Sequence, residues 1–199
     1  MLPGYLLRKH SPWIAFDAIE YLETQPLEGR KVFEYGSGGS TLYWTSRGAE
    51  CVSVEHDSAW HGTLTARLPA TAEVDYRLVP PGPLENPAAP GDPSDPEAYL
   101  SSDRNHRGSS FRTYASAIDG FPPDHFDLVM VDGRARPSCI RHAMARLKPG
   151  GMLIVDNSDR PHYARALGEL KDCSRMPFRG VVPQFVGLGQ TDIFIKGEG

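Results

Sequence analysis

The sequence lacks long hydrophobic runs. No stretch approaches the roughly 20 apolar residues that a helix needs to cross a bilayer, and the residues that follow Met1 lack the long apolar core of a signal peptide. We therefore expect no membrane partner and a cytoplasmic location.

Cysteine and clustered basic residues are also scarce. The three cysteines are Cys51, Cys139 and Cys173. They form no CxxC pair, which indicates neither a disulfide framework nor a zinc site and fits a reducing compartment. The formal net charge is -4 and Lys and Arg form no stripe, so we predict no nucleic-acid partner. A local cluster of Arg134, Arg136 and Arg141 indicates an anion site or a solvated helix face.

The length of 199 residues suits one domain with a substantial core. Hydrophobic residues make up 40% and charged residues 23%, as is usual for a globular protein. We predict a single domain over 1–199 with an N-terminal helical segment over 1–30, in which Ser11 caps a helix that begins at Pro12.

Apolar runs typical of strands alternate with segments of helical periodicity. The expected strands span 31–35, 51–55, 74–79, 126–132, 152–156, 178–185 and 191–196. The expected helices span 40–47, a segment capped by Asp57 or Ser58, 109–118, 137–147 and 159–171. A turn is expected at 148–151 and a linker at 186–190. This alternation predicts an α/β, doubly wound fold, whose mainly parallel seven-stranded sheet ends in an antiparallel strand pair.

The segment 80–107 interrupts the alternation. It is rich in proline, with Pro80, Pro81, Pro83, Pro87, Pro90, Pro93 and Pro96. Neither helix nor strand should persist there, apart from a turn at 97–100. Because long loops inside compact domains are often functional, we predict an insertion that acts as a lid or substrate loop. A passive excursion is the alternative.

A glycine-rich turn follows the first expected strand. Lys31–Tyr35 runs directly into Gly36-Ser37-Gly38-Gly39, with Glu34 near the strand end. Glu55 closes the next apolar run, about twenty residues later. Glycines let a ligand approach the backbone, and a carboxylate at the second strand tip can accept hydrogen bonds from ribose hydroxyls. The layout indicates a site for an adenosine-containing cofactor.

The third glycine of a dinucleotide fingerprint is missing, because Thr41 stands at its position. Glu34 would also repel a pyrophosphate. Both residues argue against NAD and FAD. S-adenosylmethionine has no phosphate and carries an ammonium and a sulfonium, so an acid beside the turn suits it.

The chain resembles the class I S-adenosylmethionine-dependent methyltransferases in residues 34–40, Glu55, residues 126–132 and the Lys148-Pro149-Gly150-Gly151 turn. The resemblance covers roughly 32–196 and implies a Rossmann-like sheet. It also implies that the cofactor site contains Glu34, Tyr35, Gly36, Ser37, Gly38, Ser40, Thr41, Glu55, His56 and Asp132. Trp60 is a candidate to flank the adenine or to anchor the core.

Asp132, Asp156 and Asn157 form a second group of polar residues at strand ends. Two carboxylates and an amide oxygen suit Mg²⁺ or another divalent cation. The Asp-Asn pair resembles the metal-dependent, catechol-type O-methyltransferases, in which a metal holds the acceptor hydroxyl. A role in a turn and a helix cap is the alternative.

The chain departs from that family after Asp132. The family commonly has a lysine there, whereas this chain has Gly133-Arg134-Ala135-Arg136. An arginine is a poor base but can clamp a carboxylate or phosphate. The candidate catalytic residues are therefore Asp132, Arg134 and, as a base, His162. The two other histidines considered as bases are His125 and His142.

These features predict an S-adenosylmethionine-dependent methyltransferase that acts on an oxygen of a small molecule, with metal assistance as a candidate feature. The alternatives are N-methylation, an NAD-type oxidoreductase, and a catalytically silent methyltransferase-like binding module. A homodimer is a candidate assembly.

Overall fold

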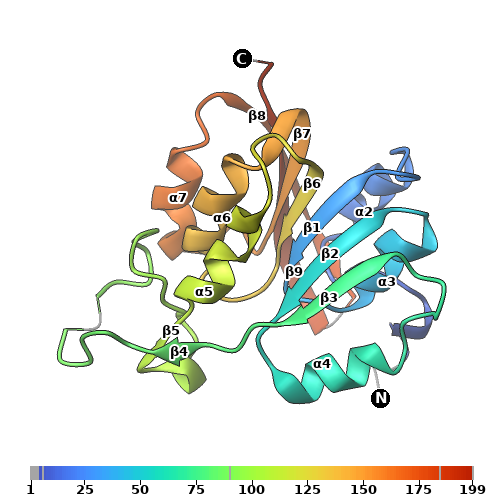
Figure 1. Ribbon diagram of the computed structural model, residues 1–199. Helices are drawn as coiled ribbons and strands as arrows, with labels where there is room; N and C mark the ends of the chain where they lie inside the picture. The colour runs from blue at the N-terminus through green and yellow to red at the C-terminus, as the bar shows by residue number, and fades with distance from the viewer. Residues whose placement is uncertain (1–4, 6, 90, 184, 199) are drawn as a thin grey trace.

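A computed structural model describes residues 5, 7–89, 91–183 and 185–198 (Figure 1). The strands of its main sheet are β1 (Lys31–Tyr35), β2 (Glu50–Glu55), β3 (Val74–Leu78), β6 (Phe126–Val131), β7 (Leu147–Asp156), β8 (Cys173–Val182) and β9 (Phe185–Lys196). The α-helices include α2 (Phe16–Glu23), α3 (Gly39–Ser46), α4 (Ser58–Thr65), α5 (Arg112–Ala115), α6 (Arg136–Met144) and α7 (Ala164–Gly168). Among the described residues, no helix is both long and apolar enough to cross a membrane.

The seven strands form one sheet in the order β3-β2-β1-β6-β7-β9-β8. Strands β1, β2, β3, β6 and β7 pair in parallel, and β9 runs antiparallel between β7 and β8. The predicted doubly wound, Rossmann-like sheet with its C-terminal antiparallel pair is confirmed.

Helices cover both faces of the sheet (Figure 1). Because side chains alternate along a strand, Phe33 and Tyr35 of β1 enter the core beneath α5 and α6. Val32 enters the core beneath α2 and α3. Glu34 therefore faces the α3 side. The parallel strands end at one edge of the sheet, where the polar residues of their tips meet.

Helix α2 begins at Phe16, so the prediction that a helix begins at Pro12 with a Ser11 cap was wrong. Residues 11–15 are held by contacts with distant parts of the chain. The Ala15 amide donates to Thr191 Oγ1 over 3.1 Å. A Cβ atom at Gly39 would lie 2.0 Å from the Ser11 carbonyl oxygen. This stretch therefore packs against the glycine turn and is not helical.

Two other predicted helices are much shorter than expected. The segment 109–118 divides into a short strand β5 (Ser109–Ser110), α5, and a 3-10 turn η2 (Ser116–Gly120). The segment 159–171 divides into η3 (Pro161–Tyr163) and α7, and Asp159 caps neither. The Ser158 amide donates to the Gln190 carbonyl over 3.1 Å, which ties this chain segment to β9 before the helix can start.

Boundaries near the carboxyl half also differ. Helix α6 ends at Met144, and β7 already begins at Leu147 because Leu147 pairs with Phe126. The predicted turn at 148–151 is an irregularity within β7, where the register shifts. The predicted linker 186–190 belongs to β9, which pairs with β8 from Cys173↔Lys196 to Val182↔Phe185.

The proline-rich segment contains two short elements that the sequence did not predict. Gly82–Pro83 forms β4, which pairs with β5, and Arg104–His106 forms the 3-10 turn η1. Between them, Tyr99 and Leu100 are buried. The segment therefore leaves the sheet, returns to the core at Tyr99, and then continues past the sheet edge that carries the strand tips.

Candidate functional site

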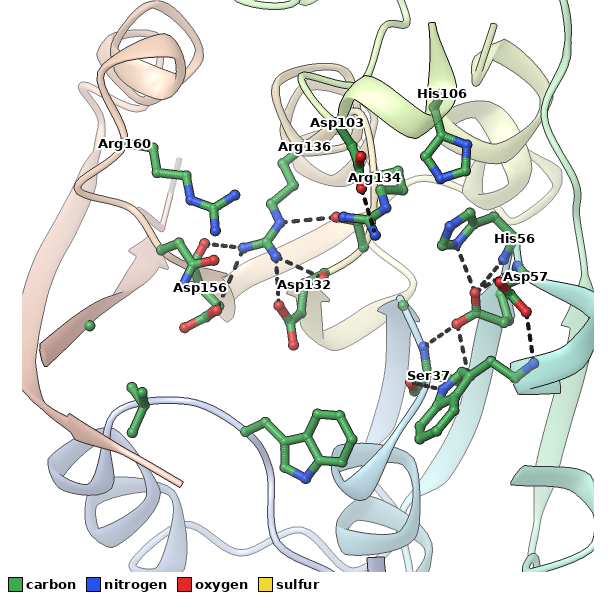
Figure 2. A pocket seen from close by; sticks show the side chains of 18 of the residues that line it. Ser37, His56, Asp57, Asp103, His106, Asp132, Arg134, Arg136, Asp156 and Arg160 are labelled. Atoms are coloured by element: carbon green, nitrogen blue, oxygen red, sulfur yellow. Dashed lines mark hydrogen bonds and ion pairs between the residues drawn. The ribbon is translucent and has the colours of Figure 1, made fainter. Parts of the chain in front are cut away.

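A cavity of about 780 Å³ lies beyond the carboxyl ends of β1, β2, β6 and β7. Its size suits a small-molecule site. The cavity is lined mainly by polar residues of the strand tips and the proline-rich segment, and the β8–β9 hairpin adds Val182, Leu188 and Gly189 (Figure 2). The acidic residues Glu55, Asp132 and Asp156 at the strand tips thus share one polar cavity.

The glycine turn brings the tips of β1 and β6 into contact. Gly36 has a φ of +89°, and a Cβ atom there would lie 2.7 Å from the backbone of Gly133. A Cβ atom at Gly133 would lie 2.0 Å from the Tyr114 hydroxyl. Only glycine fits at either position, so the cavity floor at this point is bare backbone.

Glu34 lies beneath the turn and does not line the cavity. Its buried carboxylate accepts hydrogen bonds from Thr41 Oγ1 (2.5 Å), Ser53 Oγ (2.7 Å) and Trp44 Nε1 (3.3 Å). Burial raises the pKa of Glu34, and these hydrogen bonds oppose the rise. Because Thr41 Oγ1 also accepts from the Gly38 amide (2.9 Å), Glu34 fixes the turn from below.

Glu55 lies at the tip of β2 and lines the cavity. Its Oε1 accepts from the amides of His56 (2.7 Å) and Asp57 (2.8 Å), and its Oε2 accepts from the Ser37 amide (3.2 Å) and hydroxyl (3.0 Å). Burial acts to raise the pKa of Glu55, but hydrogen bonds from His56 and Asp57 bring it below its usual value. The charged carboxylate is thus held rigidly at the cavity wall.

The wall beside Glu55 is aromatic. His56 and Trp60 line the cavity as expected, and Trp60 Nε1 donates to the Ser37 carbonyl over 2.9 Å. Trp13, which the sequence did not indicate, also lines it, with its ring 5.7 Å from that of Trp60. Tyr76 of β3 does not line the cavity, but its hydroxyl lies 2.6 Å from Ser37 Oγ.

Arg136 lies between the two acidic strand tips (Figure 2). Its Nη2 donates to Asp132 Oδ1 over 2.8 Å, and its Nη1 lies 3.6 Å from Asp156 Oδ2. It also donates to the carbonyls of Gly133 and Asp156. Burial acts to lower the pKa of Arg136, but Asp132 and Asp156 raise it overall, so the guanidinium stays charged.

This arrangement does not fit the predicted metal site of Asp132, Asp156 and Asn157. A divalent cation needs both carboxylates directed at one point about 2.0–2.6 Å away, and here the Arg136 guanidinium occupies the space between them. Asp156 Oδ1 also accepts from Thr191 Oγ1 over 2.9 Å. The metal prediction is therefore not supported.

The proline-rich segment supplies cavity residues that the sequence analysis missed. Asp103, Asn105 and His106 line the cavity. Asp103 accepts from the Asn105 amide over 3.0 Å and pairs with Arg134 Nη2 over 3.1 Å. Asp103 thus caps η1 and also links the segment to the tip of β6.

The remaining predicted site residues divide into two groups. Asp132, Arg134 and Asn157 line the cavity together with Gly36 and Ser37. Five others lie outside its lining: Tyr35, Gly38, Ser40, Thr41 and His162. Tyr35 belongs to the core, where its hydroxyl donates to the Ala115 carbonyl over 2.6 Å. His162 lines a separate small cavity behind Arg136.

No family model and no curated protein matches the sequence. Solved structures do. A methyltransferase-like protein from Silicibacter pomeroyi is 26% identical, with a TM-score of 0.54 over 90% of this chain and 86% of its own.

Two further neighbours were solved with S-adenosylhomocysteine. An O-methyltransferase from Bacillus cereus is 16% identical, with a TM-score of 0.64 over 98% of this chain and 90% of its own. The 1,6-didemethyltoxoflavin-N1-methyltransferase from Burkholderia thailandensis is 13% identical, with a TM-score of 0.51 over 97% and 79%. The predicted resemblance to class I methyltransferases is therefore confirmed as a shared fold.

Proposed function

We propose that the protein is an S-adenosylmethionine-dependent methyltransferase of a small molecule. The observation that carries the proposal is Glu55, a charged carboxylate beside the bare backbone of Gly36 in a cavity of about 780 Å³. A carboxylate in this position suits the hydroxyls of an adenosyl ribose. The neighbours solved with S-adenosylhomocysteine support the same cofactor.

The amino end of α3 argues against a dinucleotide. A pyrophosphate binds at a helix N-terminus through free amides. Here the backbone of Ser11 lies against Gly39, and the Glu34–Thr41 hydrogen bond places a carboxylate beneath the Gly38 amide. The antiparallel strand β9 also differs from the parallel sheet of NAD-binding folds. Both observations disfavour the oxidoreductase alternative.

The chain's residues would act mainly by positioning. S-adenosylmethionine, when bound, supplies a methyl group activated by its sulfonium. The acceptor oxygen forms the new bond to this methyl carbon while the carbon–sulfur bond breaks toward sulfur. Glu55 and Ser37 would hold the ribose, and the tips of β6 and β7 would align the acceptor. No step is assigned to a metal, because the Arg136 guanidinium lies between Asp132 and Asp156.

The acceptor's proton needs a base within the cavity. His106 is better placed than the predicted His162, because His106 lines the large cavity and His162 does not. Burial, His56 and Arg134 lower the pKa of His106, so its imidazole is neutral near pH 7 and can accept a proton. Asp132 also lines the cavity, but its Oδ1 is held by Arg136.

Calorimetric titration tests the cofactor. S-adenosylhomocysteine should bind with one-to-one stoichiometry, and NADH should not bind. Binding of NADH alone would overturn the proposal. Methyl transfer itself is tested by incubating the protein with methyl-labelled S-adenosylmethionine and a panel of phenols and amines. Binding without transfer to any member would favour the silent module, and the labelled product separates oxygen from nitrogen methylation.

A further inference from the structure

Three arginines converge on the half of the cavity beyond β6 and β7. Arg134 and Arg136 follow β6, and Arg160 follows β7. All three line both the large cavity and the small one behind it (Figure 2). Guanidinium groups remain charged at neutral pH, so this wall holds three fixed positive charges beside the carboxylates of Asp103, Asp132 and Asp156.

Of these three arginines, Arg136 is the one whose charge is already paired with carboxylates of the protein. Its side chain is 8% exposed and lies between Asp132 and Asp156. Its donors are directed at these two residues and at the Gly133 carbonyl. Arg136 therefore fixes the wall in place and has little capacity left to bind a ligand.

Arg134 and Arg160 are less completely paired. Arg134 is 37% exposed and contacts Asp103 of the proline-rich segment, while its buried Nε has no hydrogen-bond partner in the described part of the chain. Arg160 is exposed, and Figure 2 shows its guanidinium at the cavity without any marked contact. No ion pair of Arg160 occurs among the described residues. Arg160 thus has donors available to an incoming group, and Arg134 is only partly paired, through its Nη2 contact with Asp103.

Two nearby histidines respond to the same charge. Burial lowers the pKa of His162, and Arg160 and Arg136 lower it further. Burial and His56 lower the pKa of His106, and Arg134 adds to the effect. The arginine charges therefore lower the pKa of a histidine on each side of this wall, His162 and His106.

We propose that Arg160 and Arg134 bind an anionic group, a carboxylate or a phosphate, carried by the methyl acceptor. Arginine suits this task because its paired N–H groups match the oxygen atoms of both anions. That the anion belongs to the acceptor rests on the proposed function, whereas the anion site itself does not. The carboxylate of Asp103 competes with the ligand, because an anionic acceptor must share Arg134 with Asp103 or break their ion pair.

The test titrates simple probes into the whole protein at low salt, with and without S-adenosylhomocysteine. The probes are inorganic phosphate, benzoate and, as the neutral match of benzoate, benzamide. We expect phosphate or benzoate to bind and benzamide not to bind. Whichever anion binds more tightly indicates the group that the acceptor carries.

Three variants with stated directions sharpen the test. Arg160→Gln should weaken anion binding about tenfold, as expected for one lost charge-assisted hydrogen bond. Asp103→Asn should tighten it about threefold, because asparagine keeps the cap of η1 but releases Arg134. Arg179→Gln, an exposed arginine of β8 outside the cavity, should change nothing. Thermal unfolding verifies that each variant folds.

Several outcomes would overturn the anion site. These are no binding of either anion, equal binding of benzoate and benzamide, or an Arg160→Gln variant that behaves like Arg179→Gln. The methyltransferase proposal fails separately. If S-adenosylhomocysteine does not bind but the anions bind with the expected variant pattern, the anion site stands and the assigned function does not.

Discussion

Replacing Glu55 by glutamine is the sharpest perturbation of the candidate cofactor site. Glutamine keeps the size of the side chain and one acceptor oxygen, but it loses the charge and places an NH₂ group where the second oxygen stood. In the wild-type protein, Oε1 is held by two backbone amides and Oε2 by Ser37. A bound ribose would share Oε2, and Ser37 Oγ can retain its contact with Tyr76, 2.6 Å away.

The magnitude follows from these contacts. A hydrogen bond to a charged group contributes about 1.5–3 kcal/mol, and one between neutral groups about 1 kcal/mol. Because a ribose hydroxyl replaces an existing Ser37 bond, the lower value applies. Glu55→Gln then loses one charged bond, about 1.5 kcal/mol, and weakens the other to a neutral bond, about 0.5 kcal/mol. The total is about 2 kcal/mol, or about 30-fold in Kd.

The assay is calorimetric titration with S-adenosylhomocysteine, and Glu50→Gln is the matched control. Glu50 is exposed at the opposite end of the same strand. Circular dichroism confirms that both variants fold. A Glu55→Gln variant that binds within about twofold of Glu50→Gln would refute the reasoning and remove Glu55 from the site.

The pH dependence gives a second readout. The pKa of Glu55 is lower in the folded protein than its usual value. Its stabilising charge is therefore fully present above the unfolded pKa, about 4.3, and is lost as the pH falls through the folded pKa. Affinity should be constant from pH 8 to 5. A decline centred near neutral pH would assign the ribose contact to another group.

Three further predictions concern the scaffold of the site. Gly36→Ala should cost about 2–3 kcal/mol of stability in urea unfolding, because Gly36 has a positive φ and lies close to the backbone of Gly133. A Cβ atom at Gly38 meets nothing within 4 Å, so Gly38→Ala should cost less than about 1 kcal/mol. Equal losses would contradict the close approach. Arg136→Gln should cost about 3–5 kcal/mol by removing the cation between the buried Asp156 and the half-buried Asp132, and Arg134→Gln less than about 1 kcal/mol. A tolerated Arg136→Gln would reopen the question of a metal. Burial raises the pKa of Glu34, so its contribution to stability is greatest below the unfolded pKa and is lost as pH rises through the folded pKa. Glu34→Gln should therefore flatten the change in unfolding free energy between pH 4.5 and 8. An unchanged slope would show that the folded carboxylate is charged.

The central strands could be predicted from the sequence because each is a short apolar run with clear ends. β1 was predicted with its observed bounds, and β2, β3 and β6 to within one residue. A parallel strand that is buried on both faces has to be apolar throughout. The bounds of such a strand can therefore be predicted from its own hydrophobic run, without knowledge of its contacts with other parts of the chain.

The helix boundaries were less predictable where contacts with distant parts of the sequence determine the backbone conformation. Residues 11–15 have helical periodicity, but Thr191 and Gly39 hold them out of a helix. Phe111 would fit a helix over 109–118, but its amide donates to the Tyr99 carbonyl over 2.8 Å. Neither contact partner has a local signal in the sequence, so propensity alone gives the wrong boundary.

The site shows the same division. Glu55 and Asp132 could be predicted because strand tips of a parallel sheet meet at one edge. Asp103, His106 and Trp13 could not, because they arrive from irregular segments whose paths depend on tertiary packing. The role of Arg136 could not be predicted either. Its pairing with Asp132 is local in the sequence, but its contact with Asp156 depends on β7 lying beside β6.

The charges of the cavity give a reason for Arg136 to replace a metal. Its guanidinium cannot dissociate, so three arginine charges always accompany the carboxylates of the wall beyond β6 and β7, whereas Glu55 and Asp57 in the wall beyond β2 have no arginine beside them among the lining residues. A cationic cofactor and an anionic acceptor would then each favour one half of the same cavity. If an anion bound in the Glu55 half, it would face two carboxylates. The fixed charges thereby favour one orientation of the two molecules, with the methyl group directed toward the arginine wall.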